Sequence, residues 1–119
     1  MLGEKAQAIV LERERGDTLV AIAERHGVSH QRVSAIVRDA TALVTRVELD
    51  LMVDRKTGAP YELWIPYSAH YTVSLAFFDW LLGRLRDRGL EVAVSTRPAS
   101  NGLALLIEDV TDYSKGTER

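Results

Sequence analysis

The spacing of apolar and polar residues over residues 1–40 predicts three short helices. The first extends from Glu4 to about Arg15 and ends at a glycine. The second and third meet at Gly27, a residue type that readily adopts the positive φ with which many helices end. Ser29 is suited to cap the third helix. The pattern predicts a head of three helices with a thin apolar core that needs support from the rest of the chain.

Beyond the head, three segments alternate apolar and polar residues, which is typical of half-buried strands: Thr45–Val53, Tyr61–Ile65 and Leu90–Ser95. Leu103–Asp109 follows a turn and is expected to be the last strand. A long helix from about Ser68 to Arg88 separates the second from the third. The predicted fold class is α+β: the head, then a β-β-α-β-β module over residues 41–112 in which one helix covers an antiparallel sheet, then a polar tail over residues 113–119.

The helix of the module has apolar residues on two faces. One face would cover the sheet, and the other contains Val73, Phe77 and Trp80, followed by Arg84. A helix that lies on a single sheet needs only one apolar face. The second face therefore packs either on the head or on a second copy of the chain. In the second case these four residues form a dimer interface.

The segment Thr18–Arg38 resembles the helix-turn-helix of bacterial and phage transcription regulators and of the promoter-reading region of sigma factors. The resemblance lies in the run Ala-Glu-Arg-His-Gly-Val-Ser-His-Gln-Arg-Val over residues 23–33. It covers about the first third of the chain and implies DNA binding without indicating which site is bound. The other two thirds resemble no family known to us.

The candidate DNA-binding residues of this motif are the polar and small residues at the start of its second helix. They are Ser29, His30, Gln31, Arg32, Ser34, Ala35 and Arg38. Glutamine can pair with adenine, arginine with guanine, and an alanine methyl can contact the methyl group of thymine. Ser29 and Arg38 are better suited to phosphate. The alternative is a three-helix domain whose outer face is simply polar.

Arg55 and Lys56 lie at the tip of the hairpin that the first two strands would form. A hairpin that follows a recognition helix can act as a wing, and these two side chains could then contact phosphates beside the groove. The alternative is an ordinary solvated turn.

The charge balance limits how a single copy can bind DNA. The net charge is −2, although residues 28–38 contain two arginines and no acidic residue. A near-neutral monomer should bind DNA weakly, so we expect a homodimer on a palindromic site.

The chain has no cysteine, which excludes disulfides and thiolate metal sites. It also has no apolar run long enough to span a membrane, and we expect a cytoplasmic protein.

Together these features predict a sequence-specific transcriptional regulator, most simply a repressor that occupies a palindromic operator, with no enzymatic activity and no cofactor. One alternative is a protein-interaction factor, antitoxin-like or associated with a polymerase, whose head binds DNA only in a complex. Another is a small metal-dependent DNA-processing enzyme. Its carboxylates would be Glu48 and Asp50 on one strand, with Glu62 across the hairpin.

Overall fold

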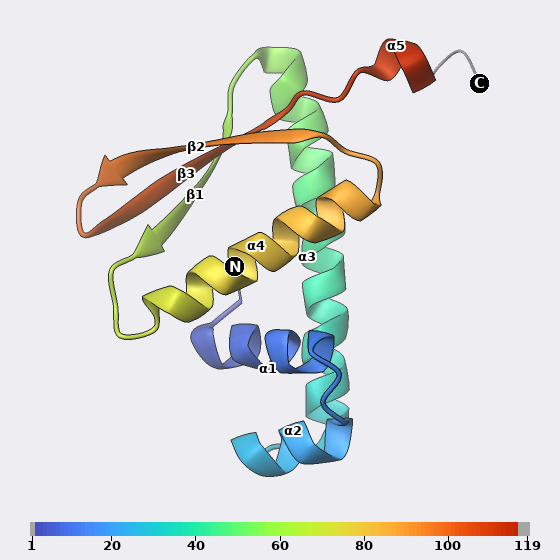
Figure 1. Cartoon of the computed structure of the whole chain (residues 1–119), viewed down its shortest axis with the longest axis vertical. Coiled ribbons are helices and arrows are strands. Elements are labelled where there is room, and N and C mark those ends of the chain that lie inside the picture. The colour runs from blue at the N-terminus through green and yellow to red at the C-terminus, as the bar shows by residue number, and fades with distance from the viewer. Residues whose placement is uncertain (1, 117–119) are drawn as a thin grey trace.

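The computed structural model describes residues 2–116 and has an α+β fold, with helices at the N-terminus and an antiparallel sheet after them (Figure 1). The elements follow in the order α1 (Glu4–Glu14), α2 (Leu19–His26), α3 (His30–Thr57), β1 (Tyr61–Pro66), α4 (Tyr71–Asp87), β2 (Val92–Ala99), β3 (Gly102–Asp109) and α5 (Tyr113–Gly116). None of the helices within residues 2–116 is long and apolar enough to cross a membrane.

The second helix of the predicted motif continues far beyond the head as α3, a single helix of 28 residues. The predicted strand at Thr45–Val53 is therefore wrong. The apolar residues there fit two periods, because Val47 and Leu51 are four apart and also belong to an alternating series. In the helix these two side chains are buried, while Leu49 is exposed. The helix ends at Gly58, which has a φ of 77°.

The sheet has three strands in the order β1-β3-β2, with both pairs antiparallel. Tyr61 of β1 lies opposite Ile107 of β3, so β1 pairs with the last strand. The module is therefore β-α-β-β in place of the predicted β-β-α-β-β. The strand predicted from alternation at Tyr61–Ile65 and the one at Leu103–Asp109 are confirmed, and the strand predicted at Leu90–Ser95 corresponds to β2, which extends to Ala99.

Two clusters of buried side chains form the core, and α3 contributes to both. In the head, Ile9 and Ile22 pack with Val33 and Ile36 of α3. In the module, Val44, Val47 and Leu51 of α3 pack with residues of α4 and the sheet. Leu43 and Trp80 pack against both clusters. The predicted boundary at residue 40 falls inside this helix, and the division of the chain there stays a prediction.

The second apolar face of α4 packs on the head. Phe77 is fully buried in the head cluster, and Trp80 stacks on it with ring centroids 5.2 Å apart. The guanidinium of Arg84 lies over the Trp80 ring and forms an ion pair with Glu14 of α1. In Figure 1, α1 and α4 are neighbours, and both run across α3. A dimer interface centred on Phe77 is therefore wrong, because the same chain already covers that side chain.

The chain after β3 is held against the end of α3. Arg55 donates a hydrogen bond to the backbone oxygen of Asp109 at 2.8 Å, and its guanidinium lies over the ring of Tyr113. The buried carboxylate of Asp109 accepts hydrogen bonds from the hydroxyl groups of Tyr113 and Thr111, each at 2.5 Å. The start of the predicted polar tail is thus anchored, and residues 117–119 lie outside the described part of the chain.

Candidate nucleic-acid interface

The turn between α2 and α3 has the hydrogen bonds of a Schellman helix end. Gly27 has φ 65° and ψ 36°, a left-handed conformation that costs glycine little. The N–H of Val28 donates to the oxygen of Ala23 at 3.0 Å, and the N–H of Gly27 to that of Glu24 at 3.4 Å. Val28 also packs against the head cluster. These contacts fix the direction in which the chain enters α3.

Side chains cap the N-termini of both helices of the motif, and the cap predicted at Ser29 is confirmed. The hydroxyl oxygen of Thr18 accepts a hydrogen bond from the N–H of Ala21 at 3.1 Å. The hydroxyl oxygen of Ser29 accepts one from the N–H of Arg32, also at 3.1 Å. Each cap satisfies a backbone donor that the helix leaves unpaired. The first turn of α3 is therefore held in place by local interactions.

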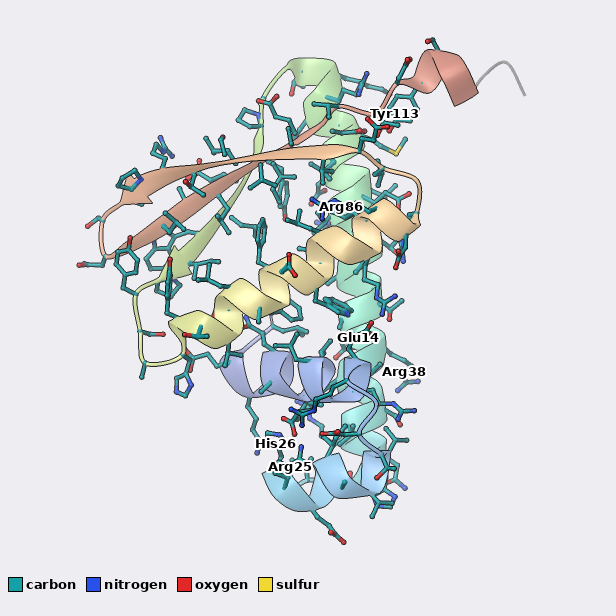
Figure 2. All side chains as sticks on the ribbon, in the orientation of Figure 1. Glu14, Arg25, His26, Arg38, Arg86 and Tyr113 are labelled. Atoms are coloured by element: carbon teal, nitrogen blue, oxygen red, sulfur yellow. The ribbon has the colours of Figure 1, made fainter. Side chains whose placement is uncertain are left out.

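Five of the residues predicted to contact DNA lie at the start of α3, and we call them the reading face: His30, Gln31, Ser34, Ala35 and Arg38. The side chains of His30, Gln31 and Arg38 are exposed, while Ser34 and Ala35 are half-buried. Within residues 2–116, the three exposed side chains form no hydrogen bond or ion pair. Figure 2 shows Arg38 projecting from α3 on the side away from α1. The face can therefore pair with an external partner without first breaking contacts inside the protein.

The basic side chains at the end of α2 are bound by acidic groups of the head. Glu12 of α1 forms an ion pair with Arg25 and a hydrogen bond with His26, whose Nε2 lies 2.6 Å from a carboxylate oxygen. Arg25 also pairs with Asp17 at 3.1 Å. Burial lowers the pKa of His26, and the charges of Lys5 and Arg25 lower it further. These residues join α2 to α1 and do not belong to the reading face. Figure 2 labels Arg25 and His26.

Arg32 is exposed but lines a groove between α3 and the start of α1, together with Lys5. Arg32 is one of the predicted DNA-binding residues, and Lys5 is not. No sequence spacing indicates this pair, because α1 and α3 come together only through tertiary packing.

The predicted wing is wrong. Arg55 and Lys56 lie in the last turn of α3 and not in a hairpin. At about 1.5 Å per residue, Lys56 is about 39 Å from His30 along the helix axis. Arg55 is in addition bound to the segment after β3. Neither residue can contact the part of a DNA duplex that the start of α3 would read.

The carboxylates considered for metal-dependent chemistry do not converge. Glu48 pairs with Arg88 at 3.1 Å, and Asp50 pairs with Arg46 one turn away on α3. Glu62 of β1 pairs with an arginine of β2. Among the residues that the structure describes, no three His, Asp or Glu side chains gather as a metal site would require. The strand face on which that hypothesis depended does not exist.

No protein-family model, curated protein or solved structure matches this chain. The function must therefore be inferred from the geometry and chemistry of the residues themselves.

Proposed function

We propose that this chain is a sequence-specific DNA-binding protein that reads the major groove with the first turns of α3. The observation that supports this most directly is the capped turn at Gly27, followed by exposed polar side chains with no partner within residues 2–116. A helix with its side chains is about 10–12 Å across, which matches a major groove about 12 Å wide.

The residues of the reading face have different roles in this proposal. Gln31 pairs with an adenine through its amide, and the methyl group of Ala35 contacts a thymine methyl. Arg38 lies about two turns beyond Gln31 on α3. It binds backbone phosphate, which positions the protein without reading sequence. His30 lies in the first turn of α3, where its ring can reach a base edge.

We further propose that the protein is a transcriptional regulator, most simply a repressor, that acts as a homodimer on a palindromic operator. The support is the charge of the chain, because a net charge of −2 leaves a single head with little attraction for DNA. In a dimer, binding of the first head holds the second head close to the same duplex, so the second head binds at a high effective concentration and the overall affinity increases. The dimer must use a surface other than the buried side chain of Phe77.

Selection from random duplex DNA with the purified full-length chain tests this proposal. The expected result is one enriched motif with two inverted half-sites. A matched selection with Gln31→Ala should give a motif that is degenerate at one position in each half-site. Enrichment of no sequence at low salt, with a protein whose circular dichroism indicates folded helices, would contradict binding by the isolated chain.

A second candidate function is a factor that binds DNA only within a larger complex. The negative net charge favours it, because the chain as a whole does not attract polyanions. The same selection separates the two candidates, since only the first predicts enrichment by the purified chain alone.

A further inference from the structure

A groove of about 460 Å³ opens between the first turn of α1 and the first turns of α3. Its polar lining consists of Glu4 and Lys5 from α1 and Arg32 from α3. Val28 and Ile36 contribute apolar lining. Ile36 belongs to the head core and Val28 packs against it, so the wall between the charged residues is firmly held.

The groove has an excess of positive charge that no residue of the described chain compensates. Lys5 and Arg32 are both exposed, and within residues 2–116 neither side chain forms an ion pair. Glu4 is the acidic residue of the lining. Its carboxylate is held by the segment before α4, where it accepts a hydrogen bond from Ser68 at 3.3 Å and lies 3.4 Å from Nε2 of His70.

The groove lies on the flank of the recognition helix. Arg32 precedes Arg38 by six residues, which places it about 120° around the helix from that residue. The major groove of DNA is bounded by a phosphate backbone on each side, so a helix that reads its floor has phosphates along both flanks. Lys5 also lies near the turn of the motif, since it lines the groove together with Val28, the residue that follows Gly27.

We propose that Lys5 and Arg32 together bind the backbone phosphates of one DNA strand beside the recognition helix. This inference rests on the proposed DNA-binding function and adds a contact from α1 to it. It also gives Arg32 a different role from a base contact. A phosphate between the two side chains accepts hydrogen bonds from an ammonium and a guanidinium, both of which bind phosphate oxygens in proteins.

Fluorescence anisotropy with the full-length chain tests this inference, using the selected duplex and a scrambled duplex between 50 and 200 mM salt. In a homodimer each substitution removes two phosphate contacts, so Lys5→Gln and Arg32→Gln should each reduce the magnitude of the slope of log K against log salt by about two, one for each protomer. Each should weaken binding to both duplexes by the same factor. The control Lys56→Gln removes the same charge at the far end of α3 and should leave the slope unchanged.

The outcomes separate the inference from the function on which it rests. If wild-type protein binds the selected duplex and Lys5→Gln keeps the wild-type slope, the phosphate site is wrong and the DNA-binding function stands. If Arg32→Gln changes the preferred base, Arg32 reads sequence and the site is again wrong. If Lys56→Gln reduced the magnitude of the salt slope by the same amount, the change would come from net charge alone, and the phosphate site would be wrong. If wild-type protein binds neither duplex, the proposed function fails and the phosphate site fails with it.

Discussion

The rings of Phe77 and Trp80 stack at 5.2 Å, and this pair joins the helix that covers the sheet to the helix-turn-helix head. Phe77 is fully buried among residues of α1, α2 and α3. Trp80 packs against the head and module clusters alike. The thin core of the head is therefore completed by an aromatic side chain from α4, which lies far along the sequence.

Replacing Phe77 with Ala should destabilise the protein by about 3–5 kcal/mol, because it removes a large buried ring and leaves a cavity. Urea unfolding followed by circular dichroism measures this change. Leu49→Ala is a suitable control, since Leu49 is 54% exposed on α3, and it should change stability by no more than about 0.5 kcal/mol. Equal stability of the two variants would show that Phe77 is not part of the core.

A fragment that begins at Thr41 should not unfold cooperatively. It lacks α1 and α2, and would leave Phe77 and Trp80 uncovered. A calorimetric scan of residues 41–116 beside the full-length chain tests this expectation. A fragment with the melting temperature of the full chain would instead support the two separate domains that the sequence predicts.

Gly27→Val should destabilise the head by about 1–2 kcal/mol, because a β-branched residue is strained at positive φ. Apart from the two neighbouring residues in the chain, no atom lies within 4 Å of the position that a Cβ would occupy, so the expected cost comes from backbone conformation and not from a clash of the Cβ. Gly83→Ala is the matched control. It also meets no atom within 4 Å but lies inside α4, where alanine should stabilise by about 0.5–1 kcal/mol. Thermal unfolding of both variants should therefore shift in opposite directions.

Asp109 should make stability depend on pH in the acid range. Burial raises the pKa of its carboxyl group, but hydrogen bonds from Thr111 and Tyr113 and the charge of Arg55 outweigh burial, so the pKa lies below its ordinary value of 3.8. A carboxyl group with a lower pKa in the folded state stabilises the protein above the unfolded pKa, and this contribution is lost as the pH falls towards the folded pKa.

Asp109→Asn should accordingly reduce stability at pH 7 and weaken its decline between about pH 5 and pH 2. Urea midpoints over this range measure the effect. Asp39→Asn, at an exposed position of α3, is the control and should follow the wild-type curve. If Asp109→Asn also follows it, the anchoring of Tyr113 contributes no pH-dependent stability.

Gln31→Ala should reduce discrimination at one base pair of each half-site by about 1–3 kcal/mol, because a bidentate contact with adenine is lost. Competition binding with duplexes that differ only at this base pair measures the loss. Arg38→Ala should weaken all of these duplexes alike. A uniform loss for Gln31→Ala would mean that Gln31 does not read a base.

The helix-turn-helix could be predicted from the sequence because the residues that begin and end its helices lie close together along the chain. Thr18 caps α2, Gly27 ends the same helix, and Ser29 caps α3, each cap accepting from a backbone N–H only three positions away. The continuation of α3 was missed because the residues over 45–53 alternate, although Val33, Ile36, Ala40, Val44, Val47 and Leu51 form a helical series when taken together. The Lys5–Arg32 groove could not be predicted, because it depends on how α1 packs against α3.

The buried residues of α3 form one uninterrupted stripe, in which successive members are three or four positions apart. The rotational phase of a single helix therefore sets both the direction of the reading face and the direction of the sheet. Removing one residue near position 41 would turn one half relative to the other by about 100° and shift it by about 1.5 Å. Phe77 could then no longer meet the head while the rest of α4 covers the sheet, so the length of α3 is constrained by packing at both of its ends.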